Sequence, residues 1–186
     1  MLGRYGFPRR TLFRRRRKSA GDSVPIRSFA PKPRWTGVPI DLFDRLERYW
    51  YSAPSHGEID RPVRPDEDEI REFEIRNGVR LPDDLRQYFL RLNGVTEDPE
   101  LYRFWPLNEV RQVDIASFQV PERDRYFFIA DYLIESYYFA IYLGATPELQ
   151  NWVVIPCMPR QPFVATSFSE FLELYLKDDP RIYGHP

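Results

Sequence analysis

The side chains that most often carry out chemistry in proteins are few in this chain. Its two histidines, His56 and His185, have no carboxylate or cysteine at a spacing that suggests a metal site. Its one cysteine, Cys157, follows a predicted strand, and no neighbouring base or helix N-terminus is available to activate a thiolate. We therefore expect these three residues to be bystanders. The sequence predicts no metal, no cofactor and no enzymatic activity.

Carboxylates are abundant, with 28 Asp and Glu residues, but abundance alone does not indicate a catalytic pair. The nine glycines are scattered singly, so the sequence contains no glycine-rich phosphate loop. Asp131 differs from the other acids, because it interrupts an apolar run and needs a polar partner there. Two interpretations stay open: Asp131 forms a structural pair with an arginine, or it lines a functional cleft.

The elements that would position such groups are organised around residues 125–144, RYFFIADYLIESYYFAIYLG. Aromatic, β-branched and small residues dominate this stretch, and they favour a pleated, buried surface. We expect two adjacent antiparallel strands, covered on both faces. A period of two divides the first strand into two faces, one with Phe127, Ile129 and Leu133 and the other with Tyr126, Phe128, Ala130 and Tyr132. A membrane-spanning helix is disfavoured, because each charge in the stretch would cost about 2.5–3.5 kcal/mol at mid-bilayer.

Helices are predicted before and after these strands. The first covers residues 41–51, the second begins at Asp66 with Glu69 in capping-box spacing, the third opens with Pro82, and the last is capped by Ser167 with Glu170. Further short strands are expected at 101–107, near 113–118 and at 152–155. This order predicts a single α+β domain over residues 35–186, with a mainly antiparallel sheet of about five to six strands.

Charge divides the chain into two unlike parts. Residues 1–34 hold eleven of the 27 Lys and Arg residues and a single acid, so residues 35–186 keep 16 basic and 27 acidic side chains, a net charge of −11. The basic part contains the run Arg14, Arg15, Arg16, Arg17 and Lys18 together with four prolines, which predicts a disordered arm. Three interpretations stay open: a solvated tail, upstream sequence included by a wrong start codon, or a tether that binds the phosphates of nucleic acid or another anionic surface.

The cysteine usage and the N-terminal sequence bear on location. A single cysteine excludes an intramolecular disulfide and fits a reducing compartment. The pair Arg9-Arg10 faintly suggests a twin-arginine signal, but basic residues follow where its apolar region should begin. We therefore expect a cytoplasmic protein with no membrane span.

Five segments follow one another along the chain in a characteristic order: Leu81-Pro82-Asp83-Asp84-Leu85 into Asn93-Gly94, Phe104-Trp105-Pro106-Leu107-Asn108-Glu109-Val110, Phe128-Ile129-Ala130-Asp131-Tyr132, Tyr138-Phe139-Ala140-Ile141 and Ala165-Thr166-Ser167-Phe168-Ser169-Glu170-Phe171-Leu172. In this order they resemble the SUKH superfamily, which includes fungal regulators of cell-wall assembly and bacterial immunity proteins. The resemblance runs from about residue 65 to residue 176. It implies a curved, mainly antiparallel sheet with helices packed on it, a protein-binding role and no catalytic apparatus.

The leading hypothesis is therefore a non-catalytic protein-interaction module, an immunity or regulatory protein. The resemblance and the acidic domain together suggest a basic partner, such as a toxin or nuclease. The candidate partner-binding residues are Asp83, Asp84, Glu97, Asp98, Glu100 and Asp131. Two alternatives stay open: a nucleic-acid-associated protein that uses the basic arm, and an enzyme with an unrecognised carboxylate site.

Overall fold

The computed structural model describes residues 40–51, 61–96, 98, 100–146, 151–158 and 162–184. Three helices come first, then six strands, then a last helix. The helices are α1 (Ile40–Tyr51), α2 (Glu67–Asn77), α3 (Asp83–Arg91) and α4 (Phe168–Leu176); the strands are β1 (Tyr102–Phe104), β2 (Arg111–Gln112), β3 (Tyr126–Tyr132), β4 (Tyr137–Tyr142), β5 (Val153–Val154) and β6 (Phe163–Ala165); the short 3-10 helices are η2 (Arg123–Arg125) and η3 (Pro180–Tyr183). The predicted α+β fold is confirmed. The basic arm lies outside the described residues, and the boundary at residue 35 stays a prediction.

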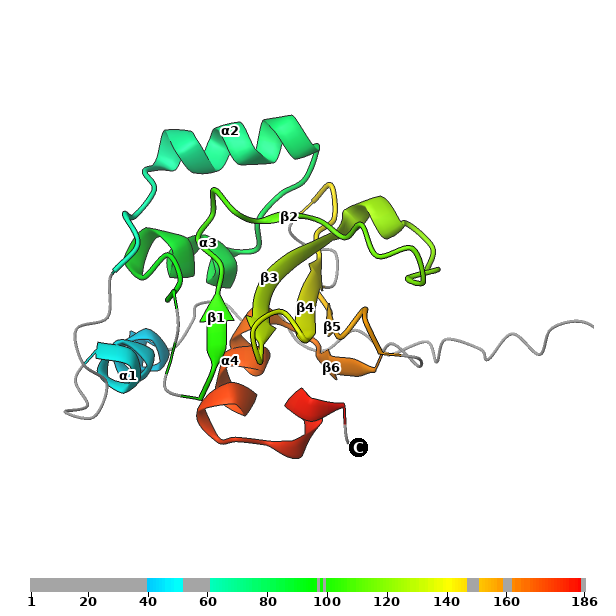
Figure 1. Cartoon of the computed structure of the whole chain (residues 1–186). Helices are drawn as coiled ribbons and strands as arrows, with labels where there is room; N and C mark the ends of the chain where they lie inside the picture. The colour runs from blue at the N-terminus through cyan, green and yellow to red at the C-terminus, as the bar shows by residue number, and fades with distance from the viewer. Residues whose placement is uncertain are drawn as a thin grey trace, which may run out of the picture. The chain divides into compact units, whose positions relative to one another are not determined.

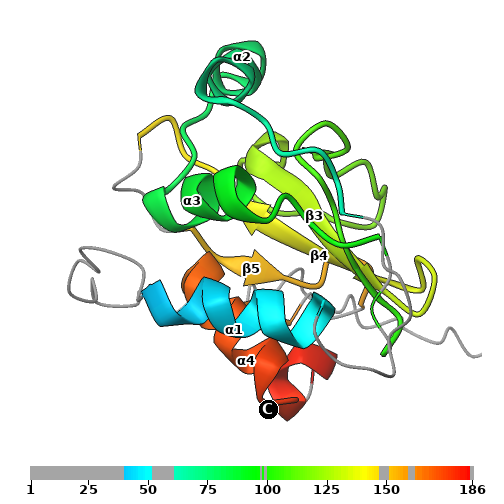
Figure 2. The ribbon, with the colours of Figure 1, turned by 90° about the vertical axis from the view of Figure 1, so that its left-hand side faces the viewer.

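Strand β3 is the centre of the sheet, as its aromatic sequence predicts. The strands follow the order β1-β3-β4-β5-β6, every pairing is antiparallel, and β2 also pairs with β3 (Figure 1). β1 lies along the second half of β3, where Tyr102 is opposite Tyr132, and β2 lies along the first half, where Arg111 is opposite Phe128. Helices α1, α3 and α4 cover one face of this sheet (Figure 2).

The side-chain alternation along β3 changes at Ile129, which is where the predicted faces become wrong. Phe128 is opposite Ala140 and Ala130 is opposite Phe139, so Ile129 is one extra residue in β3, a β-bulge. After the bulge, Ala130 shares the helix-covered face with Phe127, whose ring contacts Phe73 of α2 at 5.9 Å. Asp131 consequently lies on the opposite face.

Helices α1 and α4 complete the core from opposite ends of the chain. The Trp50 ring lies 5.1 Å from that of Phe104 on β1, and its indole nitrogen donates to the Tyr175 hydroxyl at 2.9 Å. At the edge of this contact, Arg45 pairs with Glu173 at 2.7 Å. The sheet and both terminal helices therefore share one apolar core.

Besides the packing of Phe73 on β3, one buried carboxylate links helix α2 to its neighbours. Glu74 is only 3% exposed and accepts hydrogen bonds from Arg80 at 2.8 Å, Arg86 at 2.9 Å and the Leu81 backbone at 2.9 Å. Arg86 comes from α3, so this ion-pair network joins α2 to α3 and leaves most of the outer face of α2 in solvent.

The strand expected near residues 113–118 is replaced by a turn. β2 is only two residues long, and the Phe118 backbone N–H donates to the Ile115 carbonyl at 3.0 Å, which closes the turn. The turn places the Phe118 ring against that of Tyr126, 5.0 Å away, so the side chain is buried without strand pairing.

The two predicted capping boxes have different outcomes. At α2, the Asp66 side chain accepts from the Asp68 and Glu69 backbone amides. The Glu69 side chain in turn accepts a hydrogen bond from the Asp66 backbone amide, as predicted. At α4, Ser167 accepts from the Glu170 amide at 3.1 Å, but the Glu170 carboxylate accepts from the Thr166 amide at 2.8 Å, one residue before the cap. The second box is therefore only half formed.

The cap of α2 gives a direct test of this local structure. We expect Asp66→Ala to lower the free energy of unfolding by about 1 kcal/mol, because two amides at the start of the helix lose their acceptor. Urea unfolding would measure the change. Glu72→Ala, in an exposed position of the same helix, is the matched control, and an equal loss in both variants would contradict the capping role.

Candidate partner-binding surface

The two acids at the start of α3 lie in different environments. Asp83 is exposed, whereas the Asp84 carboxylate accepts hydrogen bonds from the Leu85 amide at 2.9 Å and from the Ser169 amide and hydroxyl at 2.8 and 3.0 Å. Burial raises the pKa of Asp84, and the hydrogen bonds from Ser169 oppose that rise. Asp84 thus joins the start of α3 to the start of α4, and only Asp83 presents a free acidic surface there.

Asp98 is also an internal residue, although the sequence around it is acidic. It is 2% exposed, and one carboxylate oxygen accepts from the backbone amides of Glu100 at 2.9 Å and Tyr102 at 2.8 Å. The other oxygen accepts from the Tyr175 hydroxyl of α4. Burial raises the pKa of Asp98, while these hydrogen bonds lower it. Asp98 therefore holds the turn before β1 against α4, and Glu100 remains exposed on that turn.

Asp131 serves the hairpin that joins β3 to β4. Its carboxylate accepts from the Trp105 indole N–H at 2.6 Å and from the Glu135 backbone amide at 3.1 Å, and it is 2% exposed. A neutral indole takes the place of the arginine that the sequence suggested. The carboxylate thus fixes the hairpin turn to the residue that follows β1.

The structure brings part of the predicted set together. The Leu133 amide of the hairpin turn donates to the Leu101 carbonyl at 3.0 Å, so the turn that contains Asp98 and Glu100 lies beside the turn that Asp131 fixes. Asp83 and Asp84 are elsewhere, since Asp84 contacts the start of α4 and Asp98 contacts its end. The other predicted residues, Glu97, Arg14–Lys18 and both histidines, lie outside the described residues.

An apolar feature that the sequence did not predict lies at the same place. Four large hydrophobic side chains are exposed beside the two turns: Leu101, Leu133, Ile134 and Tyr137, at 39%, 37%, 81% and 36%. The apolar run through β3 and β4 predicted burial for Leu133. The available signal was the break at Ile134-Glu135-Ser136, where the alternation of the two strands stops.

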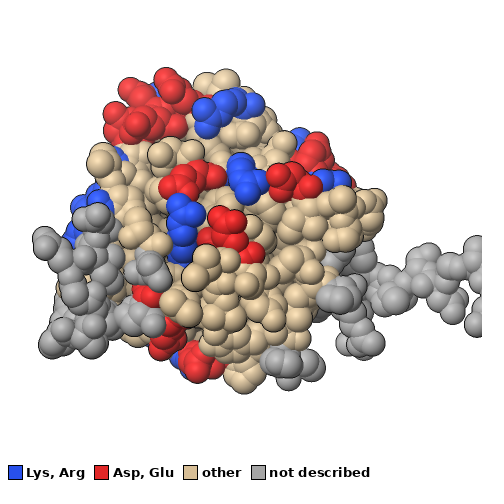
Figure 3. Space-filling model, viewed as in Figure 1, with Lys and Arg blue, Asp and Glu red and all other residues tan. Residues whose placement is uncertain are grey.

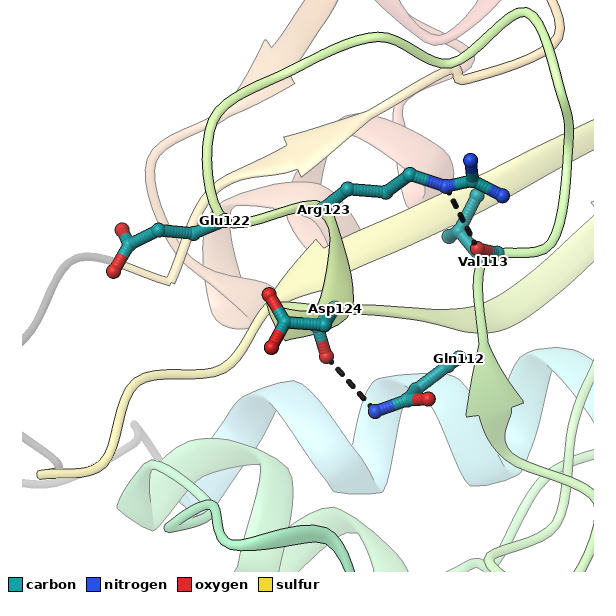
Figure 4. Close-up of a pocket in the computed structure, with 5 residues that line it drawn as sticks. All are labelled: Gln112, Val113, Glu122, Arg123 and Asp124. Carbon is teal, nitrogen blue, oxygen red and sulfur yellow. Dashed lines mark hydrogen bonds between the residues drawn. The ribbon is translucent and has the colours of Figure 1, made fainter.

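A shallow cleft of about 420 Å³ lies at the other end of β3, where five residues line it: Gln112, Val113, Glu122, Arg123 and Asp124 (Figure 4). Arg123 donates to the Val113 carbonyl at 3.4 Å, and the Gln112 side chain donates to the Asp124 carbonyl at 3.0 Å. Glu122 points away from the other labelled side chains. The lining contains two carboxylates, Glu122 and Asp124, but no histidine, serine, threonine or cysteine. Because Glu122 points away from Asp124, the two carboxylates do not face each other as a catalytic pair would.

Within the ranges that the structure describes, no three His, Cys, Asp or Glu side chains come together as a possible metal site. Over the same residues, no helix has both the length and the apolar character needed to cross a membrane. Cys157 is half-buried, with its sulfur 4.0 Å from the Ser136 carbonyl oxygen.

Comparison with known proteins supports the resemblance noted in the sequence. The model of the SMI1 / KNR4 family (SUKH-1) matches residues 64–174, which is more than half of the chain. No curated protein and no solved structure gave a match. The matched range runs from just before α2 to the last turn of α4, so it contains the whole sheet and the turns described above. This chain belongs to the SMI1/KNR4 (SUKH-1) family, a family of immunity and regulatory proteins.

Proposed function

We propose that this chain is a non-catalytic protein-binding module, an immunity or regulatory protein that binds a basic partner such as a toxin or nuclease and neutralises or modulates it. The family match over residues 64–174 carries the proposal, because members of this family are immunity and regulatory proteins. The partner's identity is the part that experiment must supply.

The charge distribution supports a basic partner. Residues 35–186 carry a net charge of −11. On the face in Figure 3, a group of acidic side chains lies over the N-terminal end of α2, where Glu67, Asp68 and Glu69 are exposed. Glu67 and Asp68 are paired with Arg86 and Arg71, which partly cancels the charge of this group, so the long-range field comes from the net charge of residues 35–186. Such a field raises the encounter rate with a cationic protein.

This proposal predicts salt-dependent association. We expect the association rate constant with the partner to fall about tenfold or more between low and physiological ionic strength, because salt screens the acidic surface. The partner would be isolated with the full chain as bait, identified by mass spectrometry and purified, and the rates measured by stopped-flow fluorescence. Inhibition of the partner's own activity at a one-to-one ratio would complete the test.

Glu100 is a suitable position for charge reversal, whereas Asp98 is not. Asp98→Lys would place a cation against buried hydrogen-bond donors and disrupt the fold. We expect Glu100→Lys to slow association about threefold at low salt, with Asp124→Lys in the distant cleft as the control. A salt-independent rate or an acidic partner would contradict the electrostatic part of the proposal. Salt-sensitive retention on DNA or RNA would favour the nucleic-acid alternative instead.

A further inference from the structure

The β3–β4 turn presents the largest group of exposed apolar side chains in the described part of the chain. Of seven exposed large hydrophobic side chains there, four lie at this turn: Leu101, Leu133, Ile134 and Tyr137, here called the hairpin-tip patch. Ile134 has 81% of its surface in solvent. Figure 3 shows a broad area without charged side chains at the lower centre and right of this face, with acidic side chains at the lower left. Groups of exposed apolar side chains are typical of interaction sites.

The backbone of the turn is in a conformation that does not favour these residues. Leu133, Ile134 and Glu135 have φ angles of 53°, 51° and 62°, and Leu101 has 66°. A non-glycine residue in this left-handed region costs about 1–2 kcal/mol, and the cost is largest for β-branched side chains such as Ile134. Because Ile134 is exposed, burial does not offset that cost. Folding alone therefore gives no reason for isoleucine at this position.

The turn is nevertheless held firmly. Asp131 accepts from the Glu135 amide at 3.1 Å, the Ser136 amide donates to the Leu133 carbonyl at 3.2 Å, and the Leu133 amide donates to the Leu101 carbonyl at 3.0 Å. Asp131 is itself fixed by the Trp105 indole. A turn whose backbone is already fixed loses little backbone entropy on binding, which raises the affinity that its contacts can supply.

The surroundings of the patch define the partner that fits it. Three exposed acids belong to the same segments: Glu100 precedes Leu101, Glu135 lies in the turn, and Asp178 follows α4. A hollow of about 150 Å³ adjoins the turn, and its lining includes Leu133, Tyr137 and Tyr183, whose hydroxyl donates to Asp178 at 2.5 Å. An apolar centre with an acidic rim matches an apolar pocket bordered by lysine or arginine.

We propose that the hairpin-tip patch is the surface by which this chain binds its protein partner. Ile134 inserts into an apolar pocket of the partner, and Lys or Arg side chains around that pocket pair with Glu100, Glu135 and Asp178. The inference rests on the proposed protein-binding function and specifies where and through which chemistry the partner is bound.

Site-specific cross-linking tests the location. In the full chain, Ile134 is replaced by the photoreactive residue benzoylphenylalanine, and in a second variant Ile75, which is 73% exposed on α2, is replaced in the same way. Both are irradiated in cells of the source organism, and adducts are identified by mass spectrometry. We expect a basic protein linked through position 134 and not through 75. An adduct through 75 alone, an acidic protein, or a second copy of this chain at 134 would overturn the assignment of the surface while leaving a protein-binding function in place.

Titration of the purified partner tests the chemistry. We expect Ile134→Gly to raise the Kd about tenfold or more, and Ile75→Gly to leave the Kd within about twofold. The same Ile134→Gly change should raise the melting temperature, because glycine adopts a φ of 51° without strain. Weaker binding by a more stable protein separates an interface role from misfolding. An unchanged Kd for Ile134→Gly overturns the proposed surface. If the full chain binds no protein at all in either experiment, the proposed protein-binding function is contradicted as well.

Discussion

Gly94→Ala is expected to lower the free energy of unfolding by about 2–5 kcal/mol, enough to unfold much of a marginally stable domain. Gly94 has a φ of 94°, a conformation that L-residues rarely adopt, and an added Cβ would lie 2.4 Å from the Phe104 carbonyl oxygen and 3.0 Å from the Pro106 nitrogen. Both atoms belong to the backbone and cannot rotate away. The neighbouring Val95 also pairs with Phe104 through two backbone hydrogen bonds, of 3.0 and 3.1 Å, so a shift would break the pairing at the end of β1.

A second glycine provides the matched control. Gly78 ends α2 with a φ of 62°, but an added Cβ there meets no heavy atom within 4 Å. Gly78→Ala should therefore cost only the conformational term, about 1–2 kcal/mol. Urea unfolding followed by tryptophan fluorescence would report both variants, since Trp50 and Trp105 are buried. Equal destabilisation of the two variants would show that the close approach at Gly94 is not what requires glycine.

Tyr175→Phe is expected to lower the free energy of unfolding by about 2–4 kcal/mol at neutral pH. The hydroxyl accepts from the Trp50 indole at 2.9 Å and donates to Asp98, so its removal leaves a buried donor and a buried acceptor without their partner. Burial and the nearby Asp98 carboxylate raise the pKa of Tyr175, so the hydroxyl keeps its proton and remains a donor.

The cost of Tyr175→Phe should grow as the pH rises. Burial raises the pKa of Asp98 and the Tyr175 hydrogen bond lowers it, so deletion of the hydroxyl should raise that pKa further. A carboxyl whose folded-state pKa lies above its unfolded value contributes stability that is present at low pH and is lost as the pH rises through the folded pKa. We therefore expect a smaller difference between wild type and variant near pH 4 than near pH 7.

Tyr142→Phe is the control for this series, because the Tyr142 hydroxyl donates to the exposed Glu122 at 2.7 Å at the surface of the sheet. Its removal should cost no more than about 0.5 kcal/mol, with little dependence on pH. The free energies of unfolding of wild type, Tyr175→Phe and Tyr142→Phe, measured from pH 4 to pH 8, would test this prediction. A Tyr175→Phe cost that is constant, or that shrinks as the pH rises, would contradict the coupling to Asp98.

The sequence was informative where local chemistry decides the structure. Asp66 and Glu69 predicted the start of α2, and the aromatic run predicted β3 and β4 as antiparallel neighbours. It was uninformative where distant donors converge. Asp98 and Glu100 are alike in sequence, yet Asp98 is buried because a hydroxyl 77 residues away reaches it, and Asp84 is engaged by a serine 85 residues away.

The sequence did not predict the hairpin-tip patch, for a related reason. Turns with positive φ usually contain Gly or Asn, which makes them recognisable in a sequence. This turn contains neither, although three of its residues have positive φ: Leu133, Ile134 and Glu135. The sequence did not indicate the bulge at Ile129 either, because a single extra residue in an apolar run does not change the local composition. Both features depend on pairing across the hairpin, which a single strand's periodicity does not encode.

The contact between α1 and α4 has a consequence for how the protein is made. Arg45 and Trp50 meet Glu173 and Tyr175 across separations of 128 and 125 residues. A ribosome adds about 5–20 residues per second, so the partner of α1 emerges roughly 6–25 s after α1 itself. During that interval α1 can pack against α3 and β1, but the side that faces α4 is open to chaperones and to other nascent chains. The synthesis of α4 ends this exposure, and a message cut short before α4 would release a chain in which that side of α1 is uncovered.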